Sequence, residues 1–435
     1  MQKPVSSNPY GRIAWRLIPF LLACYAVAIV DRFNIGFAKL QFLQDLGLND
    51  AVFGMAAGAF SVGYVALEVP SNLLLVRVGV RKTILRIMVL WGIVTVLLSL
   101  AQNQYHFYIL RFLLGAAEGG FFPGILFYLT LWFPARIQGR MTSLFVMAVP
   151  LGGIIAGPLS GLIMDRMQAV HGLHGWQWLF IIEGLPAILL GITAYFYLAD
   201  GPKTASWLSA EEKKRVEDDL AEDRKRASKS THSFAEALRE PKVHLLAFIY
   251  FAYFCSLNTI LLWAPTILKR VGVATATDIG WLSGGISVVS AIGMVAIGYS
   301  SDHSMERRWH VAVCGLVAGA CLIGLQFTQQ SIMLTVLLLA VGSIGIFAIL
   351  SLFWTIPNAT LEGNAAAGGI AFISAVGSFG GAVCPAFIGW MSVATGSIYI
   401  PLSAIAALLI IGMLALIIGV PRSKEKSLLA SPSHS

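Results

Sequence analysis

Residues 17–38 read LIPFLLACYAVAIVDRFNIGFA, an apolar stretch that is long enough to cross the hydrocarbon core of a bilayer as one helix. The stretch nevertheless contains two adjacent charges, Asp31 and Arg32. A charged side chain near the bilayer centre costs about 3 kcal/mol or more, so it persists mainly where function or a partner requires it. The stretch therefore predicts a membrane-spanning helix that contributes to a polar site.

A second apolar stretch, at about residues 106–133, also carries two charges, Arg111 and Glu118. They are seven residues apart, which places them two helical turns apart on nearly the same face. Four charges, two of each sign, in two spans indicate a polar cavity inside a helical bundle. That arrangement favours a transporter.

The composition extends this interpretation to the whole chain of 435 residues. Hydrophobic residues make up 57% of it, charged residues 12%, and the mean hydropathy is +0.77. Soluble domains carry about 25% charged residues, so the prediction is an all-α membrane protein with twelve transmembrane helices. The expected spans are approximately 17–38, 51–76, 82–102, 106–133, 141–164, 176–198, 243–267, 278–300, 309–328, 333–358, 366–391 and 397–420.

The net charge of +8 has a topological explanation. With the N-terminus in the cytoplasm and the loops assigned in alternation, 24 Lys and Arg residues fall on the cytoplasmic side. Four fall outside, namely Lys39, Arg166, Lys269 and Arg270. The positive-inside rule therefore predicts that both termini are cytoplasmic, and no nucleic-acid partner is expected.

Cysteine and histidine spacings predict neither a metal site nor a catalytic centre. All five cysteines lie in apolar segments without metal-ligand spacing, which indicates packing. His171 and His174 provide too few ligands for a metal. No nucleophile–base pair is evident at a membrane face, so we expect neither an enzyme nor a cofactor.

The chain has an internal repeat. The polar stretch 200–242 divides the expected helices six and six, which predicts bundles at 1–199 and 243–435 joined by a cytoplasmic linker, with a short cytoplasmic tail at the end. Within the linker, residues 209–226 (SAEEKKRVEDDLAEDRKR) are typical of a solvated amphipathic helix. Three features recur at an offset of roughly 223–227 residues, as expected for repeated halves. They are Pro134 with Pro357, Gly153-x4-Pro158 with Gly380-x4-Pro385, and the loop from Asn72 with the loop from Gly298.

The second of these loops resembles the signature of the major facilitator superfamily, because Gly298 is followed by Asp302 and by the basic pair Arg307-Arg308. Four further motifs resemble the anion:cation symporter branch, and the similarity covers nearly the whole chain. They are Asp31-Arg32-x-Asn34, Glu68-VPSN, RFLLGAAEGGFFPG at 111–124 and Trp176-QWLFIIEG.

The resemblance implies two six-helix pseudo-repeats in the major facilitator fold, within a bacterial inner membrane. It also implies transport of a small organic anion, such as a hydroxy, sugar or aromatic carboxylate, commonly together with a proton. Within the branch, the chain is most similar to bacterial tartrate, phthalate and hydroxyphenylacetate permeases. We expect a monomer whose partners are the anion, the proton and the bilayer.

The first loop departs from the superfamily pattern, because Asn72 and Val76 stand where Gly and Asp are usual. A charge relay in that loop is therefore not expected, whereas Asp302 keeps the possibility in the second loop. We expect the two basic loops to brace the inward-closed state as a cytoplasmic gate. Its candidate residues are Arg77, Arg81, Asp302 and Arg307.

Symport of an acid requires a permanent cation and a carboxyl group that can be neutralised. Guanidinium stays charged and binds carboxylate through two hydrogen bonds, which suits Arg32 and Arg111 to the substrate. Asp31 and Glu118 are the candidates for the proton, and apolar neighbours favour Glu118. Asp31 is expected to act also as a switchable partner of Arg111. A permanent Asp31–Arg111 ion pair that only joins two helices is the structural alternative.

Other polar positions in the expected spans resemble substrate-contact positions of the family. Helix packing or interface anchoring is the alternative for each of them. The candidates are Tyr64, Asn258, Ser351, Trp354 and Ser374.

The predicted function is uptake of the anion by proton symport, in which two halves rock around the charged site. Small residues in the fifth and eleventh spans are expected to provide close, sliding contacts. An exchanger or exporter with the same fold is the alternative, since Gly152-Gly153-x3-Gly157-Pro158 also resembles exchangers. A sensor is disfavoured because the expected tails are short.

Overall fold

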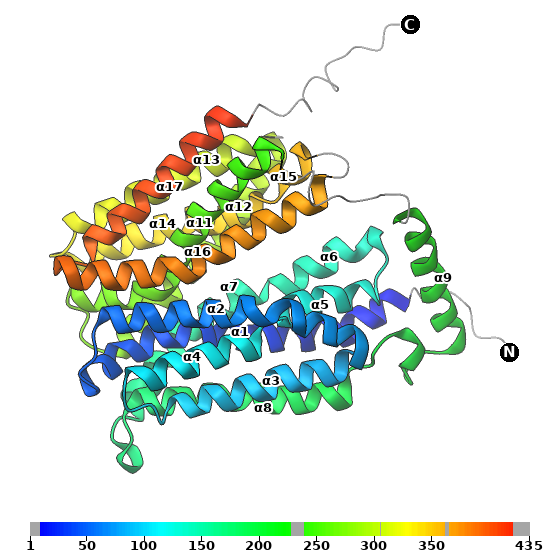
Figure 1. Cartoon of the computed structure of the whole chain (residues 1–435), viewed down its shortest axis with the longest axis horizontal. Coiled ribbons are helices and arrows are strands. Elements are labelled where there is room, and N and C mark those ends of the chain that lie inside the picture. Colours follow the sequence, from blue (N-terminus) through cyan, green and yellow to red (C-terminus); the bar gives the residue numbers. More distant parts are fainter. Residues whose placement is uncertain (1–8, 228–238, 305, 362–364, 421–435) are drawn as a thin grey trace, which may run out of the picture. The chain divides into compact units, whose positions relative to one another are not determined.

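The computed structural model describes residues 9–227, 239–304, 306–361 and 365–420, and every regular element within them is a helix (Figure 1). The first half contains α1 (Pro9–Asp45), α2 (Asp50–Val78), α3 (Val80–Leu98), α4 (Gln104–Glu118), α5 (Phe121–Thr130), α6 (Ala135–Val146), α7 (Ala148–Arg166), η1 (Val170–Gly172) and α8 (Gly175–Tyr197). The linker contains η2 (Pro202–Thr204) and α9 (Ala210–Ala227). The second half contains α11 (Pro241–Arg270), α12 (Ala276–Ser304), α13 (Arg308–Gly324), η3 (Leu325–Phe327), α14 (Ile332–Leu352), α15 (Thr355–Thr360), α16 (Ala365–Thr395) and α17 (Tyr399–Gly419).

The helices confirm the predicted fold class. In the described part of the chain, eleven helical segments are long and apolar enough to cross a membrane. The third predicted span coincides with α3, whose apolar run is shortened by Arg81, Lys82 and Arg86 in its first two turns. Each of the twelve predicted spans therefore overlaps a helix.

Three predicted spans are interrupted, which hydropathy alone did not indicate. The fourth span is divided into α4 and α5, the fifth into α6 and α7, and the tenth into α14 and α15. The first break lies at Gly120, whose φ of 90° is unfavourable for residues with a side chain. A Cβ at this position would lie 2.7 Å from Ser71 Oγ, so both conformation and space favour glycine.

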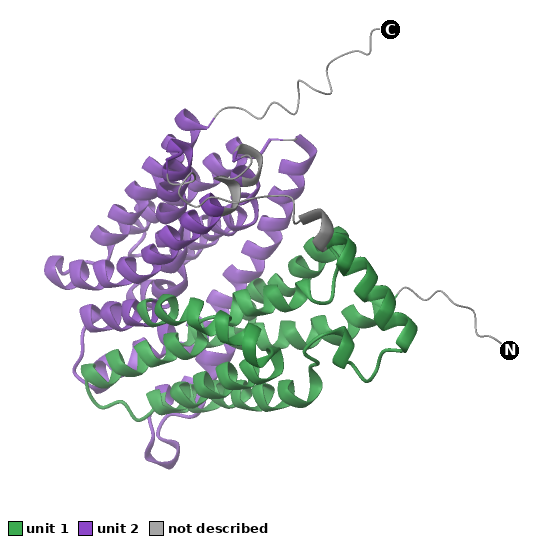
Figure 2. Ribbon diagram, turned by 45° about the vertical axis from the view of Figure 1, so that its right-hand side comes forward, with its two compact units in different colours: residues 1–34, 62–156, 177–229 green, residues 35–61, 157–176, 230–435 purple. Residues whose placement is uncertain are grey.

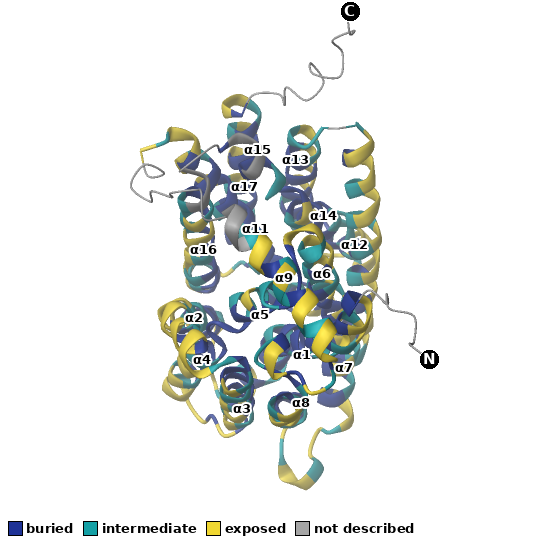
Figure 3. Ribbon diagram, turned by 90° about the vertical axis from the view of Figure 1, so that its right-hand side faces the viewer, coloured by how far each residue is buried: buried dark blue, intermediate teal, exposed yellow. Residues whose placement is uncertain are grey.

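Exposed residues, yellow in Figure 3, run along α12, and several of them are large and apolar. Trp281, Ile292 and Val295 are at least 60% exposed. A soluble protein rarely presents such a continuous apolar surface to water, whereas lipid covers it favourably. The burial pattern agrees with a multi-pass membrane protein.

The chain forms two compact units that do not follow the sequence order (Figure 2). Unit 1 comprises residues 1–34, 62–156 and 177–229, and in it α3 packs along α4. Unit 2 comprises residues 35–61, 157–176 and 230–435, and in it α11 packs along α16 while α13 packs against α14 and α17. Four helices, α1, α2, α7 and α8, contribute residues to both units. The predicted bundles at 1–199 and 243–435 remain a prediction.

The charged run in the linker forms a helix, as predicted, and that helix is docked within unit 1. Asp219 of α9 accepts hydrogen bonds from Tyr10 Oη at 2.6 Å and from Arg136 Nη2 at 2.9 Å. Asp223 accepts a hydrogen bond from the backbone N–H of Ala135 at 2.7 Å, at the start of α6. These contacts attach α9 to the first turns of α1 and α6.

Candidate functional site

Arg32 of α1 and Glu118 of α4 form an ion pair inside unit 1. Arg32 Nε donates to Glu118 Oε1 at 2.7 Å, and Arg32 Nη2 lies 2.5 Å from the same oxygen. The Glu118 side chain is fully buried, whereas 33% of the Arg32 side chain is exposed. The pair is therefore buried on its carboxylate side and reaches the accessible surface on its guanidinium side.

Asp31 is 1% exposed and is held by neutral donors. Its Oδ1 accepts hydrogen bonds from Asn34 Nδ2 at 3.1 Å and from Thr95 Oγ1 of α3 at 3.0 Å. A buried carboxylate needs such donors because water no longer solvates it. Asp31 is thus attached to α3 as well as to its own helix.

Arg111 completes the cluster on α4 and is 3% exposed. It interacts electrostatically with Asp31 and Glu118, which attract it, and with Arg32, which repels it. The cluster of Asp31, Arg32, Arg111 and Glu118, hereafter the charge cluster, has a formal charge of zero. Mutual compensation is what allows four charges to remain in an apolar bundle.

The close crossing of α2 and α4 brings Tyr64 to the charge cluster. A Cβ on Gly119 would lie 2.8 Å from the carbonyl oxygen of Tyr64, so only glycine permits this approach. The Tyr64 ring centroid lies 5.2 Å from Arg32 Cζ, a cation–π distance. Glu68, one turn further along α2, also interacts electrostatically with Arg32.

Glu118 is the last residue of α4, directly before the break that separates α4 from α5. Its Oε2 is buried and has no hydrogen-bond partner among the described residues. The ion pair to Arg32 is made by Oε1 alone. A proton-coupling role for Glu118 remains a prediction.

The predicted contact residues of the second half lie in unit 2. Trp354 packs against Tyr250 with ring centroids 4.9 Å apart, and Tyr250 stacks on Phe353 at 4.8 Å. Asn258 Nδ2 donates to the Phe254 carbonyl at 2.9 Å. Ser351 and Ser374 are exposed, and Ser351 Oγ donates to the Ala348 carbonyl at 2.9 Å. Substrate contact by these side chains remains a prediction.

Two of the four predicted gate residues form an ion pair between the last turn of α12 and the residue that precedes α13. Arg307 pairs with Asp302, and its Nη1 donates to Ser301 Oγ at 3.0 Å. In unit 1, Arg77 is exposed, and Arg81 Nε donates to the Tyr195 carbonyl at 2.8 Å. A gating role for these residues is still a prediction.

Two residues of these networks were not identified from the sequence. Thr95 donates to Asp31, and Asp200 accepts a hydrogen bond from the backbone N–H of Arg81 at 3.0 Å. Asp200 thus supplies a carboxylate beside the loop in which Val76 replaces the usual Asp. A threonine in an apolar helix carries no distinguishing pattern, and Asp200 is far from Arg81 in sequence.

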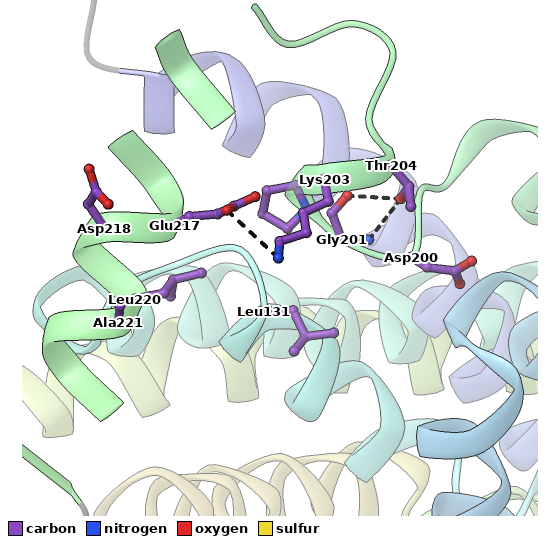
Figure 4. Close-up of a pocket in the computed structure, with 10 residues that line it drawn as sticks. Leu131, Asp200, Gly201, Lys203, Thr204, Glu217, Asp218, Leu220 and Ala221 are labelled. Atoms are coloured by element: carbon purple, nitrogen blue, oxygen red, sulfur yellow. Dashed lines mark hydrogen bonds and ion pairs between the residues drawn. The ribbon is translucent and has the colours of Figure 1, made fainter. Parts of the chain in front are cut away.

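A cavity of about 540 Å³ lies at the linker, apart from every predicted substrate residue (Figure 4). Its charged lining residues are Asp200, Lys203, Glu217 and Asp218. Lys203 pairs with Glu217 at 3.9 Å. Because carboxylates predominate there, the cavity is poorly suited to an organic anion.

Membrane-spanning helices around a buried, compensated charge cluster define a multi-pass protein of the transporter class. Its fold is similar to that of a bacterial homologue of the human lysosomal transporter Spinster, solved in an inward-facing, occupied conformation. The TM-score is 0.76 at 18% identity, and the match covers 95% of this chain and 97% of that one.

A model of the Major Facilitator Superfamily matches residues 21–367 and 246–434. The metabolite transport protein NicT of Pseudomonas putida is 42% identical over 95% of this chain and 94% of its own. A protein of Agrobacterium vitis named as a tartrate transporter is 41% identical, over 96% and 92%. A quinolone resistance transporter of Acinetobacter baumannii is 39% identical, over 92% of each. The chain belongs to the major facilitator superfamily, as its motifs predicted.

Proposed function

We propose that this transporter takes up a small organic anion together with a proton across a bacterial inner membrane. The observation that carries the proposal is the Arg32–Glu118 ion pair, which is buried at Glu118 and accessible at Arg32. A guanidinium that already binds one carboxylate has the geometry to bind another. The internal carboxylate and the carboxylate of the substrate therefore compete for Arg32.

Competition of this kind couples the transport of the anion to the transport of the proton. While Glu118 is ionised, it occupies Arg32 and weakens anion binding. When Glu118 takes up a proton, it releases Arg32. The substrate carboxylate then replaces Glu118 as the counter-charge of Arg32. Either way the cluster stays electrically balanced, which lowers the cost of changing conformation in an apolar medium.

Arg111 and Asp31 are the other two charges of the cluster, and they compensate each other. Arg111 lies in electrostatic range of both carboxylates, so it compensates Asp31 whichever partner Arg32 binds. It can also bind a second acidic group of the substrate. The name of one relative supports an organic acid as cargo, since that protein is named as a tartrate transporter.

Export of an organic compound is the second candidate function. It is favoured by one observation, the 39% identity to a quinolone resistance transporter. A buried ion pair that opens on protonation would serve proton-driven export as well as uptake. Uptake and export can be distinguished by the direction of the pH gradient that drives accumulation of the substrate.

The decisive test uses the purified protein in proteoliposomes with an imposed pH gradient. Symport uptake predicts that an acidic exterior drives accumulation of a labelled acid such as tartrate or 4-hydroxyphenylacetate, and that a protonophore abolishes it. Proton-driven export predicts the opposite dependence on the gradient. Accumulation that persists with the protonophore, or that requires a preloaded anion, would contradict proton symport.

A further inference from the structure

A second group of charges lies in unit 2, outside the charge cluster. Lys39 is buried in it, whereas 15% of the Asp50 side chain and 37% of the Arg270 side chain are exposed. Lys39 of α1 was expected in an external loop, but α1 continues to Asp45 and the Lys39 side chain is only 2% exposed. Its Nζ lies 2.9 Å from Asp50 Oδ1, at the start of α2. Asp50 Oδ2 also lies 3.0 Å from Nη2 of Arg270, the last residue of α11.

One carboxylate thus joins two cations from helices of different halves of the chain. Asp50 is not needed to cap α2, because the side chain of Asn49 accepts the hydrogen bonds from the first turn, at 3.1 and 3.2 Å. The carboxylate is therefore free to serve the two cations.

The ammonium group of Lys39 is also enclosed by aromatic rings. Its Nζ lies 3.4 Å from the Trp263 ring centroid and 4.3 Å from that of Phe53. The two rings meet edge to face, with centroids 5.2 Å apart. A desolvated cation in this position depends on its carboxylate partner, because neither ring neutralises its charge.

Lys39, Asp50 and Arg270 are called the triad below. Close backbone contacts near the triad also join α1 and α2 to helices of the second half of the chain. A Cβ on Gly36 of α1 would lie 3.0 Å from the Leu262 carbonyl of α11. A Cβ on Gly58 of α2 would lie 2.6 Å from the Ala382 carbonyl of α16. At these two glycines the backbones of neighbouring helices approach closely because no side chain intervenes.

We propose that Lys39, Asp50 and Arg270 form a latch that closes the external end of the transport path. The inference rests on the proposed function and its topology, in which these helix ends face outward. With the helices together, Asp50 compensates both cations and the two rings exclude water from Lys39. When α1 and α2 move away from α11, water solvates the three charges separately, so the triad has two stable arrangements.

The test measures how often this end of the protein opens. Ala57 of α2 is 3% exposed and lies between Gly54 and Gly58 along the helix. In an Ala57→Cys background, a membrane-impermeant maleimide applied from outside reports opening. The five native cysteines are buried, and the parent chain gives their contribution.

Asp50→Asn leaves Lys39 buried without its counter-charge, so we expect labelling of Cys at position 57 to accelerate about tenfold or more. Adding Lys39→Met removes the orphaned cation and keeps an apolar side chain between the rings. The double variant should therefore label within about twofold of the background. A merely structural role would make the double variant worse, not better.

Arg166→Gln is the matched control, because Arg166 is an exposed cation at the end of α7 on the same predicted side. It should leave the labelling rate unchanged. If Asp50→Asn does not fold, Arg270→Gln carries the test, with an expected acceleration of about two- to fivefold. Unchanged labelling in Asp50→Asn and Arg270→Gln, or no rescue by Lys39→Met, would overturn the latch. Labelling requires no substrate, so this result is independent of whether the cargo is an organic acid.

Discussion

At the scale of single residues, the charge cluster shows how four ionisable side chains remain stable in an apolar bundle. Each charge has an opposite charge in electrostatic range, and Asp31 also has two neutral hydrogen-bond donors. Removing one member leaves the others uncompensated, which costs more than the interaction itself contributes. Substitutions that remove a charge should therefore be chosen to imitate a state of the transport cycle.

Glu118→Gln imitates the protonated carboxyl group permanently. We expect it to lose accumulation driven by a pH gradient, at least about tenfold, because no proton can be exchanged at that position. Exchange of internal for external substrate should persist, since Arg32 stays available to the anion. Both are measured in proteoliposomes, with exposed Glu217→Gln of α9 as control. Normal gradient-driven accumulation by Glu118→Gln would show that the proton binds elsewhere.

Thr95→Val tests the donor that fixes Asp31. Valine has the same shape but lacks the hydroxyl group, so the buried carboxylate loses a hydrogen bond at a cost of about 1–3 kcal/mol. We expect a lower Tm in detergent and a slower initial rate of uptake. Thr95→Ser keeps the hydroxyl and should restore most of both. An equal Tm and an equal rate of uptake for the valine and serine variants would contradict the role of the Thr95 hydroxyl as the donor to Asp31.

At the scale of elements, glycines decide where helices break and how closely they approach. The break at Gly120 leaves Glu118 at a helix end, and the junction at Gly79 connects α2 to α3. Gly79 adopts φ 90° and ψ 163°, a conformation that is essentially restricted to glycine. A Cβ there would lie 2.7 Å from Asp200 Oδ1.

Gly79→Ala should therefore destabilise the protein by about 1–3 kcal/mol through backbone strain, with a further contribution from the clash with Asp200. Asp200→Ala removes the clash and also the acceptor for the Arg81 N–H. We expect the double variant to lose less stability than the sum of the single variants. Thermal unfolding in detergent measures all three. Additive losses would mean that Asp200 does not press on this junction.

At the scale of the whole molecule, a transporter must close the two ends of its transport path in alternation. Within unit 2, α7 and α12 approach so closely that a Cβ on Gly157 would lie 2.5 Å from the Gly280 carbonyl. This close contact agrees with the sliding surface predicted for the fifth span, although the sliding itself is untested. Gly285, also on α12, has open space around it, since a Cβ there would meet no atom within 4 Å.

Gly157→Ala should therefore hinder closure of the end of the transport path at which α7 contacts α12, whereas Gly285→Ala should not. We expect the first variant to lose uptake about tenfold or more while an organic acid still raises its Tm, because binding does not require the end to close. The second variant should transport normally. Loss of uptake in both variants, or in neither, would exclude a specific role for the α7–α12 contact.

The sequence by itself determined the helical membrane fold, the approximate bounds of the spans and the four residues of the charge cluster. Hydropathy and charge placement are local properties, and the cost of charge in a bilayer makes Asp31, Arg32, Arg111 and Glu118 visible without coordinates. The family motifs then indicated the superfamily, which the comparisons confirmed.

Only the tertiary structure decided which charges touch. It paired Arg32 with Glu118, gave Asp31 its donor on α3, and placed Lys39 between two aromatic rings beside Asp50. These contacts join residues distant in sequence, and the close crossings that create them depend on backbone spacing at individual glycines. Hydropathy contains no information on that spacing, because an apolar helix satisfies the bilayer equally well in any rotation about its axis.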